Sequence, residues 1–312
     1  MTDSSAVLVD GPWQHRFVSA NGARFHVAES GSDPTAPLVL LLHGFPQHWW
    51  AWRHQLPALA AAGYRAVAMD LRGYGASDKP PQGYDMPTLT RDVAGVIRSL
   101  GAQDAVVVGH GIGGTIAWSM PSLQPSVTRA IAVLSSAHPA RLYSSAVTRP
   151  LLARPSGRRL ALFQVPLLPE RRLTRGDLTT RLLAEWAAPG WPAAEVAATY
   201  RAAMQIPFAA HSSLEMFRWL ARSMPRVDGQ RYLASVRGPV RVPVLQVHGR
   251  LDRCLPASAV GTGRHGNPFR FETIPGAGHF LPEEAAERST DVLLDWLGSL
   301  ESASPDQSVA SA

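Results

Sequence analysis

Short apolar runs alternate with stretches of helical periodicity on both sides of a long central segment. Several of the runs, Ala105–Val108 among them, are wholly apolar. Such runs are typical of strands buried on both faces of a mostly parallel sheet. The pattern predicts eight strands: Arg16–Ser19, Arg24–Ala28, Pro37–Leu42, Arg65–Met69, Ala105–Val108, Ala130–Leu134, Val242–His248 and Phe269–Ile274.

Helical patterns lie between these strands. They cover Trp50–Ala62, Met86–Leu100, Gly113–Leu123 and Glu283–Leu300. The last begins beside Pro282 with two glutamates, which suit the first turn of a helix by proline placement and by the helix dipole. Strands that alternate with helices predict an α/β fold, with a mostly parallel eight-stranded sheet flanked by helices.

The segment from about residue 140 to residue 231 breaks this rhythm. It contains no convincing buried strand and is rich in Arg, Leu, Ala and Pro. We therefore expect a helical lid (cap) at 140–231, inserted into a core formed by 1–139 and 232–300. The final stretch, 301–312, is composed mainly of Ser, Ala, Pro and Asp, and we expect it to be disordered.

Charge and cysteine usage exclude some classes of function. Of 30 basic residues only Lys79 is a lysine, and no basic run is interleaved with aromatic residues, so nucleic-acid binding is not expected. Residues 141–231 contain 14 arginines against 6 acidic residues. That segment could attract an anionic substrate or an anionic membrane surface, or could present a solvated helical face.

The compartment is inferred from equally simple features. No run of about 18 uninterrupted apolar residues occurs, so no integral membrane association is expected. The first residues do not resemble a secretory signal. Cys254 is the only cysteine, which fits a reducing cytoplasm and excludes an internal disulfide. A homodimer is compatible with the sequence.

The run Gly109-His110-Gly111-Ile112-Gly113-Gly114 follows the strand Ala105–Val108. A nucleophile elbow consists of a strand, a sharp turn and a helix, with small residues around one exposed position. That exposed position normally holds Ser, Asp or Cys. Here it is Gly111, which has no side chain and cannot attack a substrate. The glycine spacing also departs from the dinucleotide fingerprint G-x-G-x-x-G, so no nucleotide cofactor is expected.

Further motifs follow one another in a characteristic order. They are His43-Gly44-Phe45-Pro46, Trp49 to Gln55, Asp70 to Pro80, the elbow, His138-Pro139, His248 to Asp252 and Gly276 to Phe280. In this order they resemble the epoxide-hydrolase branch of the α/β-hydrolase fold, and mycobacterial-type members above all. The resemblance covers roughly residues 12–300.

The resemblance implies a role for individual residues. His279 resembles the general base, and Asp252 resembles the carboxylate that orients it. The backbone amides of Phe45 and Ile112 resemble the oxyanion hole, which Gly111 leaves intact. Tyr200 resembles one of the two lid tyrosines that protonate the opening epoxide oxygen. No tyrosine stands at the second expected position, close before Phe163.

Aromatic and apolar residues of these segments indicate an apolar pocket for a small or lipid-like substrate. The candidates for its lining are Trp49, Trp50, Phe163, Met204, Phe208 and Phe280. No metal-ligand spacing occurs, so we expect neither a metal nor any other cofactor.

Gly111 leaves four functional hypotheses open. In the first, His279 activates a water that hydrolyses an apolar epoxide or ester slowly and directly. In the second, the protein binds a small molecule without catalysis. In the third, the His279–Asp252 dyad performs base chemistry other than hydrolysis. In the fourth, Gly111 is an altered position in an ordinary epoxide hydrolase. The first is favoured because a binding protein needs no acid–base dyad.

Overall fold

The computed structural model describes residues 2–31, 33–223, 225–261 and 268–302. All eight predicted strands form one sheet, in the order β1-β2-β4-β3-β5-β6-β7-β8. β1 and β2 are antiparallel and β2 pairs antiparallel with β4, whereas the other neighbours are parallel. The strands are β1 Gln14–Ala20, β2 Ala23–Ser30, β3 Leu38–Leu42, β4 Arg65–Met69, β5 Ala105–His110, β6 Thr128–Leu134, β7 Val244–Gly249 and β8 Phe269–Ile274.

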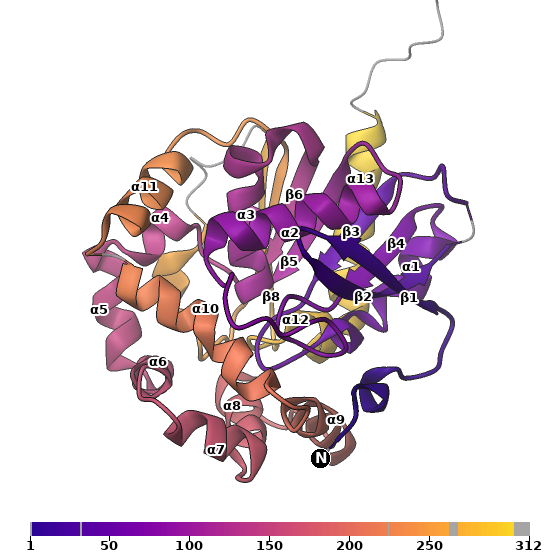
Figure 1. Cartoon of the computed structure of the whole chain (residues 1–312). Coiled ribbons are helices and arrows are strands. Elements are labelled where there is room, and N and C mark those ends of the chain that lie inside the picture. Colours follow the sequence, from indigo (N-terminus) through magenta and orange to yellow (C-terminus); the bar gives the residue numbers. More distant parts are fainter. Residues whose placement is uncertain (1, 32, 224, 262–267, 303–312) are drawn as a thin grey trace, which may run out of the picture.

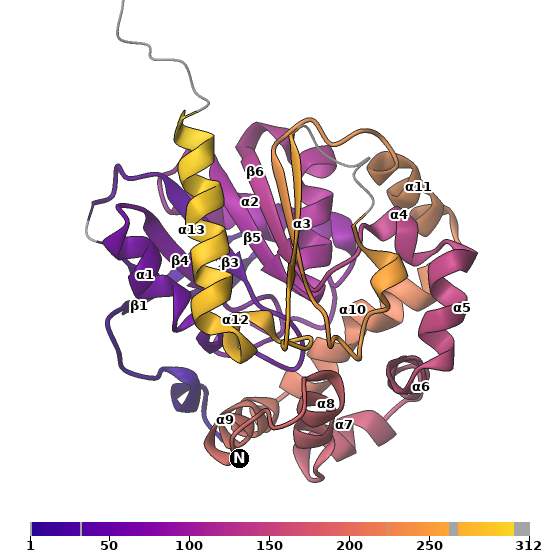
Figure 2. The same ribbon diagram turned by 180° about the vertical axis from the view of Figure 1, so that it is seen from behind.

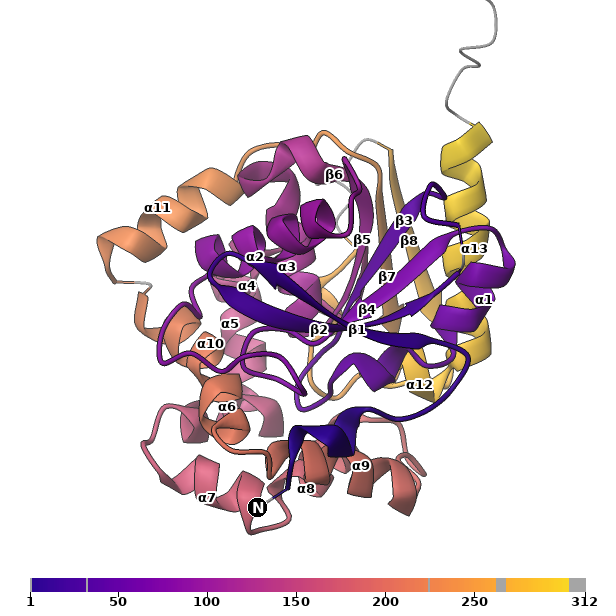
Figure 3. The ribbon, with the colours of Figure 1, turned by 45° about the vertical axis from the view of Figure 1, so that its right-hand side comes forward.

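Helices cover both faces of the sheet, which confirms the predicted fold class (Figures 1 and 3). The flanking helices are α1 Gln55–Ala61, α2 Met86–Ser99, α3 Ile112–Leu123, α12 Leu281–Glu284 and α13 Ala286–Ser302. The pleat of β3 shows how the layers are built: Leu40 belongs to the core under α2 and α3, while Leu41 belongs to the core under α1 and α13.

Two of the predicted helices are interrupted. The pattern at Trp50–Ala62 divides into a 3-10 turn, Trp49–Trp52, and α1. The pattern at Glu283–Leu300 divides at Ala285 into α12 and α13. The carboxylate of Glu284 accepts hydrogen bonds from the backbone N–H groups of Ala188, Gly278 and Phe280, and these tie α12 to the loop before it and to the chain that follows α8.

The segment between β6 and β7 is helical. Its helices are α4 Pro139–Leu142, α5 Ser145–Ala153, α6 Pro155–Phe163, α7 Leu168–Thr174, α8 Leu178–Trp186, α9 Ala194–Met204, α10 Ala209–Ser223 and α11 Val227–Val236. Of these, α6 to α9 lie beyond one end of the strands, whereas α4 and α11 lie beside α3 (Figures 1 and 2). The division into core and lid at 140–231 stays a prediction. Its later boundary falls inside α11, where Tyr232 and Ser119 of α3 share a hydrogen bond.

The expected disordered tail, 301–312, begins within α13, which continues to Ser302; its remaining residues lie outside the described part of the chain. None of the described helices is both long and apolar enough to cross a membrane.

Asp70 joins several loops at the carboxyl edge of the sheet. It directly follows β4 and is completely buried. Its carboxylate accepts hydrogen bonds from Trp49 N at 2.9 Å, Ala76 N at 2.9 Å and His26 Nδ1 at 2.8 Å. Burial raises the pKa of Asp70, but the hydrogen bond and charge of His26, with the nearby His48, hold it well below its ordinary value. The loop that carries Phe45 and Trp49 is thereby fixed.

We expect Asp70→Asn to lower the free energy of unfolding by about 3 kcal/mol at neutral pH, because the substitution removes the carboxylate charge from the buried pair of Asp70 and His26. The folded-state pKa of Asp70 lies below its unfolded value of about 3.9. The stabilisation is therefore present above that value and is lost as the pH falls through the lower folded pKa. Urea unfolding at several pH values should show the wild type and the variant converging in acid.

Asp104→Asn is the matched control, since this carboxylate pairs with Arg129 at an exposed position. Its loss should change the free energy of unfolding by less than about 1 kcal/mol. An Asp70→Asn variant as stable as this control would contradict the role given to Asp70.

Candidate active site

The elbow is a tight passage of the backbone from β5 into α3. Gly111 lies between them with φ 53° and ψ −114°, a conformation that residues with a Cβ adopt only under strain. Gly113 permits the close approach of α3 to the end of β3, because a Cβ there would lie 2.4 Å from the carbonyl oxygen of Leu42. The backbone of the elbow is thus formed, although the position that normally carries the nucleophile has no side chain.

The space over Gly111 faces His279. A Cβ built on Gly111 would lie 3.4 Å from Nε2 of His279 and 3.6 Å from Cα of Gly44. These are ordinary van der Waals distances, so the surroundings leave room for an atom above the elbow. The structure therefore brings together His279 and the elbow position, which are 168 residues apart in the sequence.

Asp252 fixes the orientation of His279. Nδ1 of His279 lies 3.0 Å from Oδ2 of Asp252, and both side chains are buried. The other carboxylate oxygen, Oδ1, accepts hydrogen bonds from the backbone N–H groups of Cys254 and Leu255, each at 2.8 Å. Because a carboxylate can only accept, Nδ1 carries the proton and the lone pair of neutral His279 is on Nε2, which faces Gly111.

The charge of Asp252 is secured by its neighbours. Burial raises the pKa of Asp252, but the charge and hydrogen bond of His279, together with His248, lower it below its ordinary value. Burial and the nearby Asp252 raise the pKa of the Cys254 thiol well above its usual range. A protonated thiol is a poor nucleophile, so Cys254 does not replace the missing elbow side chain.

His110 supports the His279 loop from within the core. Its Nε2 lies 2.8 Å from the carbonyl oxygen of His279. Burial is the main cause that lowers the pKa of His110 to about 3, and the charge of His279 lowers it further. The ring of His110 is therefore neutral, and its Nε2–H donates this bond. A Cβ on Gly44 would lie 2.4 Å from Nδ1 of His110, so the tight loop before Phe45 packs on the same ring.

Phe45 and Ile112 both line the cavity beside Gly111. Ile112 is the first residue of α3, where a backbone N–H has no acceptor within the helix and the helix dipole favours negative charge. Phe45 follows β3 and packs edge-on against Phe163 and Phe217 of the lid. That the amides of these two residues form an oxyanion hole stays a prediction.

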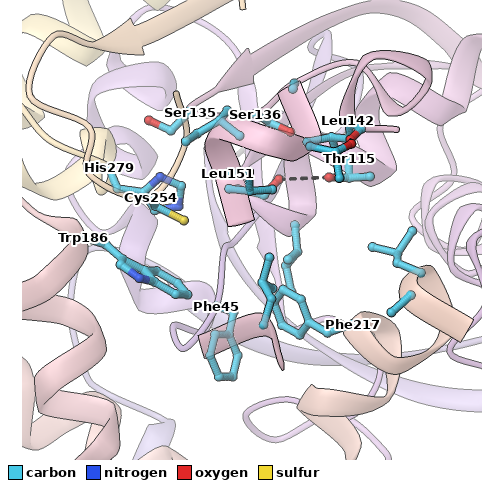
Figure 4. A pocket seen from close by; sticks show the side chains of 18 of the residues that line it. Phe45, Thr115, Ser135, Ser136, Leu142, Leu151, Trp186, Phe217, Cys254 and His279 are labelled. Carbon is cyan, nitrogen blue, oxygen red and sulfur yellow. Dashed lines mark hydrogen bonds between the residues drawn. The ribbon is translucent and has the colours of Figure 1, made fainter. Parts of the chain in front are cut away.

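The cavity between the elbow and the helices of the insertion has a volume of about 370 Å³. Figure 4 shows Trp186, His279 and Cys254 on one side of it and Phe45 and Phe217 on another. No aspartate, glutamate, lysine or arginine is among its described lining residues. The arginines of the central segment are thus not among them.

The six residues expected to line the pocket lie elsewhere. Trp49, Met204 and Phe280 are fully buried in the packing of the protein, and Phe163 stands behind Phe45. Phe208, in contrast, is 73% exposed. Of the described lining residues none belongs to this set, which is Trp49, Trp50, Phe163, Met204, Phe208 and Phe280.

The sequence could not fix which face of each lid helix turns inward. α6 and its carboxyl end line the cavity with Leu160, Ala161 and Gln164, whereas Phe163 on the same helix packs against Phe45 and Phe217. Ser135 and Ser136 could have been found, because they directly follow β6 and the carboxyl ends of parallel strands surround the sites of such sheets.

Tyr200 does not reach the cavity, which corrects the role implied by the resemblance. It is completely buried on α9, and its hydroxyl donates to Oε2 of Glu283 at 2.7 Å. Its ring packs edge-on against His48 and Trp50. Tyr143 is the tyrosine among the described lining residues, and its hydroxyl donates to the carbonyl oxygen of Leu220 at 3.1 Å. Neither tyrosine has its proton free for a substrate in this arrangement.

The chain is similar to known proteins along most of its length. A family model described as the alpha/beta hydrolase fold matches residues 37–286. Epoxide hydrolase 3 of Xenopus tropicalis is 33% identical over 298 residues, which cover 91% of this chain and 78% of that protein. Epoxide hydrolase B of Mycobacterium tuberculosis is 52% identical over 114 residues, which cover 36% of this chain and 32% of that relative.

The fold of this chain is also similar to solved structures of epoxide hydrolases. The crystal structure of epoxide hydrolase A from Mycobacterium thermoresistibile superposes with a TM-score of 0.77 at 27% identity, covering 92% of this chain and 98% of that one. An epoxide hydrolase from an endophytic Streptomyces superposes with a TM-score of 0.78 at 28% identity, covering 94% of this chain and 97% of that one. This chain belongs to the α/β-hydrolase fold family, in its epoxide-hydrolase branch.

Proposed function

We propose that the protein is a hydrolase that cleaves an apolar, uncharged ester by direct attack of water, without a covalent enzyme intermediate. The observation that carries the proposal is the position of Nε2 of His279, 3.4 Å from where a Cβ of Gly111 would stand. A water in that place would lie where the nucleophile of an elbow acts, with the lone pair of the base directed at it.

The steps follow from the residues. His279 takes a proton from the water while the water oxygen bonds to the ester carbonyl carbon. The carbonyl oxygen gains the negative charge, which the amides of Phe45 and Ile112 would stabilise. The tetrahedral intermediate then expels the alkoxide, which receives the proton held on His279, and leaves a carboxylic acid and an alcohol. Asp252 stabilises the imidazolium between the two proton transfers.

The expected rate is modest. General base catalysis contributes about 10²–10⁴-fold, and one oxyanion donor contributes about 10²–10³-fold in enzymes where it has been removed. A covalent nucleophile would split the reaction into two easier steps, and Gly111 forgoes that advantage. Slow turnover is therefore part of the proposal.

An ester is favoured over an epoxide by the placement of the tyrosines. An epoxide needs an acid for its opening oxygen, and Tyr200 donates instead to Glu283. An ester needs only the two backbone amides for its oxyanion. An uncharged substrate is favoured because the described cavity lining offers no cationic partner other than His279 when it is protonated, and burying an unpaired carboxylate is costly.

Replacing the base tests the proposal. We expect His279→Ala to lower kcat/KM for a neutral aryl ester by about 10²–10⁴-fold, because the water loses its proton acceptor. Asp252→Asn should also lower it, since the amide can present its N–H to Nδ1 and leave the proton on Nε2. Initial rates measured above the buffer background decide this.

His211→Ala is the matched control, because His211 is half-exposed on α10 and is not among the described lining residues of the cavity. Wild type and His279→Ala hydrolysing at the same background rate would overturn the hydrolase. Saturable binding of the ester without turnover would then support the binding protein. Exchange of a substrate C–H proton that depends on His279 would support other base chemistry.

Filling the space over the elbow is a second test. Gly111→Ala should abolish hydrolysis, because the methyl group would occupy the position proposed for the water. It should also lower the free energy of unfolding by about 1–3 kcal/mol, because alanine is strained at a φ of 53°. Gly101→Ala, at φ 83° with open space around a Cβ, is the control for strain alone. Full activity in a folded Gly111→Ala protein would contradict attack by water from this position.

Restoring a nucleophile is a third test. In Gly111→Ser the introduced hydroxyl would stand next to Nε2 of His279, since the Cβ itself would lie 3.4 Å away. We expect a burst of alcohol release and an acyl adduct on the introduced serine, detectable by intact-protein mass spectrometry, whereas the wild type forms none. The double variant with His279→Ala should lose the adduct. A folded Gly111→Ser protein that never acylates would show that the amides and the dyad do not form a working site.

A further inference from the structure

Four consecutive apolar residues are exposed where α6 passes into α7. They are Val165, Pro166, Leu167 and Leu168, which we call the apolar tip. Leu167 is 66% exposed and has a φ of 64°, which is uncommon for a residue with a bulky side chain. A contiguous exposed apolar surface of this kind marks an interaction site more often than scattered exposed residues do.

The apolar tip is held firmly by α10. Arg218 donates to the carbonyl oxygens of Phe163 and Val165, at 2.9 and 3.1 Å, and also pairs with Glu170 at 2.7 Å. Arg222 donates to the carbonyl oxygen of Gln164 at 2.8 Å. The leucines are thus presented to solvent by a segment fixed at both ends.

Positive charge adjoins the apolar tip. Leu168 is followed at helical spacing by Arg171, Arg172 and Arg175, so all four lie along one face of α7 and its carboxyl end, while Leu173 faces inward. The three arginines are exposed, and in the described part of the chain none of them forms an ion pair. Leucines flanked by unpaired arginines complement an anionic lipid surface, where the apolar groups enter the headgroup region and the guanidinium groups meet phosphates.

The cavity opens beside the same surface. Ala161 of α6 and Ala221 of α10 line the cavity and are also exposed. Ala161 is one helical turn before the apolar tip, and Ala221 directly precedes its anchor Arg222. Figure 2 shows α6, α7 and α10 as neighbours at the lid end of the molecule. A membrane bound by the apolar tip would therefore lie next to the cavity entrance.

We infer that the apolar tip and the arginines of α7 form a peripheral docking surface for anionic membranes. The surface binds lipid independently of the hydrolase activity. Its position would let an apolar substrate pass from the bilayer into the cavity with little exposure to water.

Vesicle flotation tests this inference with the full chain. Binding is expected to vesicles made of equal parts phosphatidylcholine and phosphatidylglycerol, and it should weaken with added salt. Vesicles of phosphatidylcholine alone should bind far less. Arg171→Gln, Arg172→Gln and Arg175→Gln should each weaken binding about fivefold. The double variant Leu167→Ser/Leu168→Ser should weaken it at least about tenfold.

Two controls are matched in chemistry. Arg91→Gln/Arg98→Gln changes exposed arginines of α2, and Val227→Ser changes an apolar residue that is 67% exposed on α11. Both should bind mixed vesicles as the wild type does, and thermal unfolding should show every variant folded. No binding to mixed vesicles, or binding that the tip and α7 variants leave unchanged, would overturn the inference. Self-association abolished by Leu167→Ser, without lipid binding, would overturn it too and assign the surface to a second copy of the chain.

Discussion

The hydrogen bond between Nδ1 of His279 and Oδ2 of Asp252 determines what the rest of this site can do. It is buried, and the second carboxylate oxygen is occupied by two backbone amides, so the carboxylate cannot turn to another partner. The bond leaves the lone pair of His279 on Nε2. Without it the space over Gly111 would be an ordinary gap between a loop and a helix. With it, that space faces an oriented base.

Gly111 has two effects on the elbow: it removes the backbone strain, and it removes the nucleophile. A side chain at an elbow is held in a strained backbone conformation, and that strain persists only where the surrounding structure imposes it. Glycine removes the strain and keeps the backbone path, so the amide of Ile112 at the start of α3 is retained. The glycine therefore removes the nucleophile and leaves the backbone at the start of α3 and the His279–Asp252 pair in place. The slow, direct reaction proposed for this chain depends on these remaining groups.

The sequence was sufficient to predict the strands of the sheet but not to predict which residues line the pocket. Arg65–Met69 and Phe269–Ile274 both became strands with the predicted bounds. Arg65–Met69 is buried on both faces, and such burial leaves an apolar signature that does not depend on distant residues, whereas Phe269–Ile274 is a partly exposed edge strand. The pairing of Asp252 with His279 was implied by the resemblance, and the structure places the two in the loops after β7 and β8, at the edge where the carboxyl ends of these strands meet. The lid offered no such rule. Phe163 and Ala161 stand on one helix, and only packing against Phe45 decides that the alanine and not the phenylalanine meets the cavity.

The packing of the central segment shows that its arginines have different roles. Arg218 and Arg222 donate their hydrogen bonds to backbone carbonyls and so act as structural anchors, whereas Arg171, Arg172 and Arg175 remain exposed beside the leucines. The described cavity lining, in turn, contains no arginine at all. No arginine or lysine of the described lining therefore faces this space, whereas three exposed arginines lie on α7 and its carboxyl end, next to α6. The proposed choice of uncharged substrates and the inferred docking to anionic membranes would thus depend on neighbouring parts of the insertion, and α6 connects them because one of its faces lines the cavity and its end leads into the apolar tip.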